Sequence, residues 1–237
     1  MAIGLLPPDA GTIQFNGAGK PTDKSVRARI GVAPQALAVY EDLTGRENLN
    51  FFGRLQGLRG ATLHDRVKWA LDFVGLTDRA NDPASADSGG MKRRLNMAAA
   101  IIHDPDLLLF DEPTVGVDPQ SRNAIFERIL ELKDTGKTIV YTTHYMEEAQ
   151  RLCNRVGIMD HGKLLALDTV PGLIQTHGPK QIVIAETEQG RVELETDDPV
   201  AELSQLRASN NLKRFTVEEP NLEHVFLHLT GRHLRDQ

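Results

Sequence analysis

The stretch LLLFDEPT, residues 107–114, decides the fold class because a continuous apolar run stops abruptly at two acids. We predict a β-strand over residues 106–110, since short unbroken apolar runs are typical of parallel strands buried on both faces. Such a strand delivers Asp111 to the carboxyl edge of the sheet, where open α/β sheets bind ligands. There Asp111 can hold Mg²⁺, usually through water, and Glu112 can polarise a water molecule for attack on phosphorus. A buried strand followed by two acids at the start of the next helix explains the same residues without a ligand.

The segments on both sides of this strand alternate between strand and helix. A capping box at residues 44–47 (TGRE) marks a helix start, and apolar residues at helical spacing indicate a second helix over 63–74. The remaining predicted elements are strands over 30–33 and 138–143 and helices over 91–103 and 121–133. This order indicates an α/β fold with a mostly parallel sheet covered on both faces.

The pattern of apolar and polar residues changes near residue 178. We predict half-exposed strands over 181–185 and 191–195, a helix over 200–206, an extended segment over 215–217 and a helix over 221–229. These elements form a small α+β appendage. We therefore predict one domain over residues 1–178, with a helical subdomain over about 44–104, and a small accessory C-terminal domain over 179–237.

A second candidate site lies at the start of the helix predicted over residues 91–103. Ser88, Gly89 and Gly90 precede that helix, so their amides, the hydroxyl and the positive helix end form a possible anion site. Such residues more often form only an ordinary turn at the start of a helix. The helix spans roughly 18 Å at about 1.5 Å per residue, which argues against one phosphate touching both Ser88 and Asp111. Two separate surfaces are therefore implied.

Two further polar residues follow predicted strands. His144 comes directly after the strand over 138–143, on the same sheet edge as Asp111, and could hydrogen-bond a terminal phosphate. Gln35 comes just after the strand over 30–33, where its amide could orient water or a metal ion. Either residue alone would more often be structural.

The stretch NGAGKPT, residues 16–22, superficially matches a phosphate-binding loop. That loop requires G-x-x-x-x-G-K-[ST], but Gln14 stands at the first glycine and Pro21 at the hydroxyl position. We therefore interpret the stretch as a hairpin connection after a short strand over residues 12–15.

The composition narrows the possible partners and compartment. The net charge of −6 over 237 residues is spread along the chain, so we expect no nucleic-acid partner, which usually requires a basic face. The apolar runs are too short to cross a bilayer, and the single cysteine, Cys153, rules out an internal disulfide. We expect the chain in the cytosol or against the inner face of a membrane.

The order of these motifs resembles the ATP-binding subunit of ATP-binding-cassette (ABC) transporters. Gln35 corresponds to the Q-loop, residues 88–91 (SGGM) to the signature motif, 107–112 to Walker B, 116–118 (GVD) to the D-loop and His144 to the switch histidine. The resemblance covers about residues 1–178 and implies a P-loop NTPase-type sheet with a helical signature subdomain.

The resemblance implies ATP and Mg²⁺ as cofactors and a head-to-tail dimer with a second nucleotide-binding subunit, most simply a second copy. In its own half-site, Asp111 would support Mg²⁺, Glu112 would be the general base, His144 would contact the γ-phosphate and Gln35 would sense the metal and the membrane partner. Ser88, Gly89 and Gly90 would close on the ATP held by the opposite subunit, and Asp118 would cross the dimer interface.

Two residues depart from the family pattern. Asp87 replaces the usual apolar or aromatic residue before the signature serine, and Met91 replaces the commoner glutamine. Met91 is familiar in the exporter subgroup, whereas an acid beside a phosphate site could weaken binding.

The tail resembles the accessory region of drug- and antibiotic-resistance exporters of the daunorubicin-resistance, ABC-2 type. Residues 220–226 (PNLEHVF) and 229–231 (LTG) carry this resemblance. It implies export of a small molecule through a separate ABC-2 type transmembrane permease at the cytoplasmic face of the membrane. His224 and His228 lie four apart on a predicted helix, but Val225 stands where a zinc metalloprotease helix needs Glu, so we interpret them as a surface pair.

In this family a turn such as residues 7–11 (PPDAG) comes just after the helix that the phosphate loop opens, so we expect Walker A upstream of Met1. On this expectation the 237 residues are an N-terminally truncated or misassigned form of an exporter ATPase. Two alternatives stay open. The chain could be a degenerate, non-catalytic subunit that lends only its signature motif to a partner, or a soluble ABC ATPase without a transport role.

Overall fold

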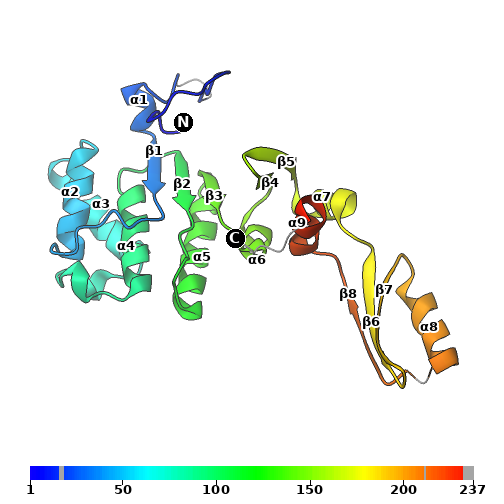
Figure 1. Cartoon of the computed structure of the whole chain (residues 1–237). Coiled ribbons are helices and arrows are strands. Elements are labelled where there is room, and N and C mark those ends of the chain that lie inside the picture. The colour runs from blue at the N-terminus through cyan, green and yellow to red at the C-terminus, as the bar shows by residue number, and fades with distance from the viewer. Residues whose placement is uncertain (16–18, 211, 232–237) are drawn as a thin grey trace. The chain divides into compact units, whose positions relative to one another are not determined.

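The computed structural model describes residues 1–15, 19–210 and 212–231, which divide into two compact units, Met1–Thr143 and His144–Gln237 (Figure 1). Each unit is considered by itself below. The domain boundary predicted between residues 178 and 179 falls inside the second unit and stays a prediction. Among the described residues, no helix combines the length and apolar character that crossing a membrane requires.

The first unit is built on a parallel three-stranded sheet with the order β1-β2-β3. The strands are β1 (Ile30–Ala33), β2 (Leu107–Asp111) and β3 (Thr138–Thr142). Because they are parallel and in close register, with Asp111 beside Thr142, their carboxyl ends meet at one edge. The predicted parallel α/β sheet is confirmed.

Helices connect these strands. The chain between β1 and β2 forms α2 (Gly45–Leu55), α3 (Gly60–Phe73), the short 3₁₀ helices η1 (Thr77–Arg79) and η2 (Ala84–Ala86), and α4 (Gly89–Ile101); α5 (Pro119–Asp134) joins β2 to β3. Both hydrogen bonds of the predicted capping box are present, because Thr44 caps the amide of Glu47 and Glu47 caps that of Thr44. Leu49, Leu71 and Leu95 are almost fully buried, one on each of α2, α3 and α4, and the three helices pack against one another.

The two faces of the sheet differ in their covering. Leu108 and Phe110 of β2 are almost fully buried on one face. On the opposite face Val32, Leu109 and Val140 are neighbours across the three strands, and Val32 and Val140 remain 37% and 49% exposed. The expectation of a sheet covered on both faces is therefore wrong for the described residues, because no described helix of this unit buries that row.

The N-terminal segment contains less regular structure than expected. The predicted strand over residues 12–15 is wrong, because only Phe15 forms an isolated bridge, to Gly19. Alternating residues do not form a strand without a neighbouring strand to accept their hydrogen bonds. Of the stretch at 16–22, residues 16–18 lie outside the described residues. The amide of Lys20 donates to the Asp23 carboxylate over 2.9 Å, and α1 (Lys24–Arg27) follows.

The second unit begins with α6 (Met146–Leu152), the antiparallel hairpin β4 (Val156–Asp160) and β5 (Lys163–Asp168), and α7 (Val170–His177). The chain continues through β6 (Gln181–Thr187), β7 (Gly190–Thr196), α8 (Pro199–Asn210), β8 (Arg214–Glu218) and α9 (Leu222–Thr230). The predicted α+β composition of this region is confirmed.

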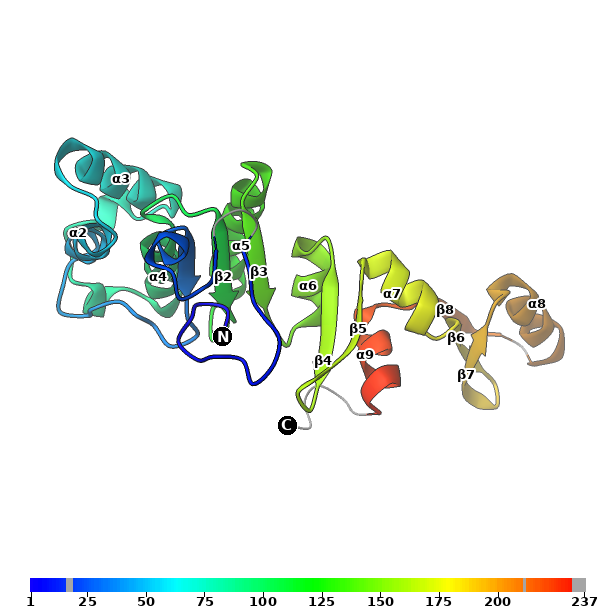
Figure 2. The same ribbon diagram turned by 90° about the horizontal axis from the view of Figure 1, so that it is seen from above.

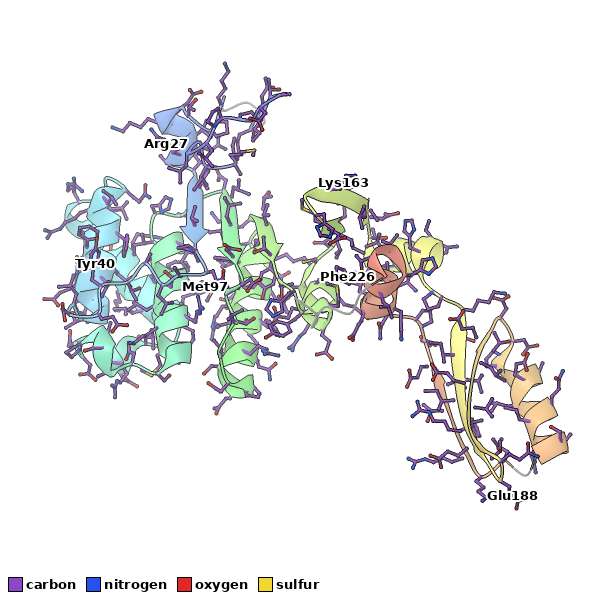
Figure 3. All side chains as sticks on the ribbon, in the orientation of Figure 1. Arg27, Tyr40, Met97, Lys163, Glu188 and Phe226 are labelled. Carbon is purple, nitrogen blue, oxygen red and sulfur yellow. The ribbon has the colours of Figure 1, made fainter. Side chains whose placement is uncertain are left out.

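The terminal helix α9 returns to pack on the start of the second unit (Figure 2). Leu222, Val225 and Phe226 of α9 (Phe226 is labelled in Figure 3) share a buried cluster with Ile158 of β4 and Leu173 of α7. Residues after 178 therefore contribute to the core formed by the elements before it. The other part of the unit is an antiparallel sheet with the order β7-β6-β8, against which α8 packs.

Candidate functional site

The carboxyl edge of the first unit's sheet positions the two acids that follow β2. Asp111 ends β2, and its Oδ1 atom accepts a hydrogen bond of 2.5 Å from the hydroxyl of Thr142, which ends β3. The amide of Glu112 lies 3.1 Å from the Thr142 carbonyl oxygen and 3.3 Å from the Thr142 hydroxyl. The end of β3 therefore holds the acidic pair in place.

Glu112 has an unusual backbone conformation. Its φ angle is 43°, in the left-handed region that a residue with a Cβ atom adopts at a cost of about 1–3 kcal/mol. Such strain persists only where surrounding contacts fix it. The Oε2 atom of Glu112 accepts a hydrogen bond of 3.1 Å from Nε2 of Gln35. The structure thus brings Gln35 to the acidic pair.

Helix α4 holds the loop that carries Gln35. Asn96 is 3% exposed; its Nδ2 atom donates to the Pro34 carbonyl and its Oδ1 atom accepts from the Ala38 amide, both over 3.1 Å. These two bonds fix the backbone on both sides of Gln35. Sequence reasoning missed Asn96, and the only available signal was a polar residue between the apolar positions Leu95 and Met97.

Arg93, one turn before Asn96, connects the same loop to the turn after β2. Its guanidinium donates to the carbonyl of Gln35 and, over 3.4 Å, to that of Val115. Burial lowers the pKa of Arg93, and the nearby charge of Glu112 opposes that shift. Arg93 therefore links the loops after β1 and β2.

The basic residues 92–94 (KRR) near the start of α4 make contacts within the first unit. All three side chains are partly buried, and each binds a different element. Besides Arg93, Lys92 pairs with Glu41 over 2.7 Å, and Arg94 donates to the Val74 carbonyl over 2.6 Å.

The second candidate cluster lies at the start of α4. Ser88 is the N-cap residue, and its hydroxyl accepts a hydrogen bond of 3.3 Å from the Met91 amide. Gly89 is exposed, whereas Gly90 is buried against the start of α5. A Cβ atom at Gly90 would lie 2.5 Å from Cβ of Ser121 and 3.5 Å from Oδ2 of Asp118, so only glycine fits. The structure thus places Asp118 beside the predicted anion site.

Asp118 caps the start of the next helix. It is the N-cap residue of α5, and its Oδ1 atom accepts a hydrogen bond of 2.9 Å from the Ser121 amide. This bond lowers the pKa of Asp118. The remaining predicted site residue, His144, is the first residue of the second unit, where its ring centroid lies 4.0 Å from that of Tyr145.

Comparisons with known proteins identify the family of this chain. The family model described as ABC transporter matches residues 1–115. Over its whole length the chain is 41% identical to the linearmycin resistance ATP-binding protein LnrL of Bacillus subtilis, of which it covers 86%. This chain belongs to the ABC transporter family. It is also 41% identical to the Nod factor export ATP-binding protein I of Sinorhizobium fredii, with 100% of this chain and 74% of that protein covered.

Solved structures of ABC transporter subunits share the fold. An ATP-binding subunit of an ABC transporter matches with a TM-score of 0.64 and 30% identity over 73% of each chain. CbiO1 from Clostridium perfringens matches with a TM-score of 0.63 and 25% identity over 71% of this chain and 69% of that one. The P-loop NTPase fold class is confirmed, and members of this ABC ATPase family bind and hydrolyse ATP.

The donor atoms at the carboxyl edge suit Mg²⁺ that is held jointly with a nucleotide. No cluster of three or more His, Cys, Asp or Glu side chains that could hold a metal ion occurs in the part of the chain that the structure describes. Mg²⁺ is usually bound by one or two carboxylates together with phosphate oxygens and water, rather than by a cage of protein groups. Asp111, with the Glu112 carboxylate and the Gln35 amide beside it, fits that donor set.

Proposed function

We propose that this chain is the ATP-binding subunit of an exporter and couples ATP hydrolysis to movement of a small, drug- or antibiotic-like molecule through a separate ABC-2 type permease. The names of its relatives support this proposal, since one is a linearmycin resistance protein and another a Nod factor export protein. The subunit acts at the cytoplasmic face of the membrane, and no nucleic acid takes part.

The contact between Gln35 and Glu112 carries the catalytic part of the proposal. Glu112 is the general base that takes a proton from the attacking water, and Gln35 orients its carboxylate through the 3.1 Å bond. Asp111, oriented by Thr142, is the metal-supporting residue. Bound Mg²⁺ would supply neutralisation of the phosphate charge during the transfer. His144, two positions after β3, contacts the terminal phosphate.

The cluster at the start of α4 serves the other active site of a dimer. Ser88, Gly89 and Gly90 bind the phosphates of the ATP held by a second, identical subunit, because amides at a helix start attract anions. Asp118, next to Gly90, meets that subunit across the interface. In this dimer each subunit supplies the acidic pair to one site and residues 88–90 to the other.

Asp87 is compatible with this role despite its charge. Its side chain is only 5% exposed, so the carboxylate is withdrawn from the surface where an anion would bind. Burial raises the pKa of Asp87, and the charge of Arg79, 4.0 Å away, partly offsets that shift. The buried position and the opposite charge of Arg79 reduce the repulsion that an exposed acid would exert on a phosphate.

The proposal is tested by measuring Mg·ATP hydrolysis with the full-length gene product. We expect Glu112→Gln to lower kcat by at least about 100-fold, because the residue would no longer accept the proton. Glu127→Gln, at an exposed position of α5, is the matched control and should leave kcat unchanged. Full activity of Glu112→Gln would contradict the role of Glu112.

A second measurement separates the catalytic subunit from the degenerate one. The non-catalytic form would hydrolyse no Mg·ATP alone. Its Gly89→Asp variant would nevertheless lower the activity of a pair formed with an intact cassette subunit. Unchanged activity of that pair would contradict the proposed role of residues 88–90 in binding the ATP of the second subunit.

A further inference from the structure

Within the described residues, the small sheet of the second unit leaves one apolar edge strand open. Its order is β7-β6-β8, so β7 and β8 are its two edges. In β8, with the sequence RFTVE, only Val217 is partly covered, and Phe215 is 53% exposed. Open edge strands present unpaired amide and carbonyl groups, and natural proteins usually protect them with charges, prolines or bulges. The centre of β8, residues 215–217, has none of these.

The sequence of β8 is complementary to itself when it is read in the antiparallel direction. If two copies pair with Thr216 opposite Thr216, Arg214 faces Glu218 of the second copy at both ends. Phe215 then faces Val217 of the second copy. Opposite charges and aromatic or β-branched pairs directly across an antiparallel sheet are each worth about 0.2–1 kcal/mol relative to alanine pairs.

The faces of the two sheets also match in this arrangement. A two-fold axis through Thr216 and normal to the sheet keeps each side chain on its own face. Phe215 and Val217 pair with Ala185 and Val183 of β6, two fully buried residues, so they belong to the apolar face of the sheet. The second copy would therefore extend this apolar face and cover Phe215.

The other edge of the sheet disfavours the same pairing. In β7, with the sequence GRVELET, the central residue of a self-paired strand is the exposed Glu193. Antiparallel pairing about that centre places two carboxylates directly opposite each other, which destabilises a sheet. The charge pattern therefore disfavours this centred pairing of β7, and pairing through β8 leaves the β7 strands as the two outer edges.

We propose that β8 pairs with β8 of a second copy of this chain, which makes one continuous six-stranded antiparallel sheet. This interface goes beyond the nucleotide-dependent dimer proposed above and forms without ATP. Because five residues a side bury little surface, the interface is weak when it acts alone, with dissociation in the micromolar range or above. It closes on itself, so it gives dimers and not fibres.

Cysteine cross-linking tests the geometry directly. Thr216→Cys in a Cys153→Ala background places two thiols across the two-fold axis, where opposed Cα atoms about 4.5–5.5 Å apart permit a disulfide. We expect nucleotide-free protein to form a cross-linked dimer on mild oxidation. Glu193→Cys in the same background is the matched exposed control on β7 and should stay monomeric. Equal cross-linking of both variants, or none at Thr216→Cys, would overturn the proposal.

Charge reversal tests the pairing without cross-linking. Glu218→Arg opposes Arg214 of the second copy and should weaken the nucleotide-free dimer about tenfold in sedimentation equilibrium. Within its own sheet Glu218 neighbours Ile182, so the monomer should keep its melting temperature. The double variant Arg214→Glu/Glu218→Arg restores complementarity and should restore the dimer. A concentration-independent monomer in the unmodified protein would refute β8 pairing and leave the ATPase proposal untouched, since Glu112→Gln tests that separately.

Discussion

Gln35 and Glu112 are 77 residues apart in the sequence, yet their side chains form a hydrogen bond of 3.1 Å at the carboxyl edge of the sheet. The contact depends on the parallel pairing of β1 and β2, which ends both strands at the same edge. It also depends on the left-handed backbone of Glu112. The pair therefore joins the loop after β1 to the loop after β2.

The first prediction concerns Gln35 itself. Gln35→Ala removes the donor that orients Glu112, so we expect kcat for Mg·ATP hydrolysis to fall about tenfold, the effect of one lost hydrogen bond of about 1.4 kcal/mol. The exposed side chain contributes little to packing, so the melting temperature should stay constant. Gln205→Ala on the surface of α8 is the control. An unchanged kcat would separate Gln35 from the reaction.

The second prediction concerns Asn96, which supports Gln35 from α4. Asn96→Ala leaves the Pro34 carbonyl and the Ala38 amide without their partner, and it should lower the free energy of unfolding by about 1–3 kcal/mol. Because the loop loosens, kcat should fall as well. Urea unfolding and ATP hydrolysis measure the two effects.

Asn50→Ala is the matched control for Asn96. The Asn50 amide donates only to the Arg46 carbonyl one turn earlier in α2, in a partly exposed position. We expect a loss below about 1 kcal/mol and normal activity. Equal losses in the two variants would mean that Asn96 has no special role in holding the Q-loop.

The difference between Asp111 and Asn96 explains how far the sequence predicts this site. Asp111 follows an unbroken apolar strand, so its place at the sheet edge follows from local pattern and the parallel fold. Asn96 and Arg93 act on a loop about 60 residues away, and their roles depend on the packing of α4 against that loop. No local spacing encodes such a contact.

Sequence patterns also fail to predict segments whose structure depends on a neighbouring strand or helix. The capping box at Thr44 is confirmed because both of its hydrogen bonds are made within four residues. The strand expected over residues 12–15 is absent because a strand requires a neighbouring strand, and alternation cannot supply one. Partial exposure of Val32 and Val140 has a similar cause, since burial of the second face of a sheet depends on another element.

The third prediction concerns the packing of Gly90. Gly90→Ala brings a methyl group within 2.5 Å of Ser121 Cβ, so α4 and α5 must separate, and we expect a loss of about 1–3 kcal/mol in unfolding free energy. Gly89→Ala is the neighbouring control, because its nearest atom would be the Gly116 carbonyl oxygen at 3.8 Å. Thermal unfolding should separate the two variants clearly. Similar melting temperatures would contradict the close approach of α4 and α5.

The fourth prediction is a pH dependence of stability from His103. This residue ends the turn after α4, and its Nε2 atom lies 3.2 Å from the Ile30 carbonyl oxygen, so Nε2 carries the proton of the neutral ring. Burial lowers the pKa of His103; the bond to Ile30 and the charge of Asp104 raise it, whereas Arg66 and Lys137 lower it. Protonation is therefore disfavoured in the folded protein.

The sign of the effect follows from proton linkage. In the unfolded chain a histidine titrates at about pH 6.5. Between that pH and the lower pKa of His103 in the folded protein, the unfolded chain binds more protons than the folded protein does. The free energy of unfolding should therefore decrease as the pH falls from about 7.5 through this window. Urea unfolding across the range should show a smaller decrease for His103→Gln than for the unmodified protein. His64→Gln, at an exposed position of α3, should keep the full decrease, and equal pH slopes in all three proteins would show that His103 is not the titrating group.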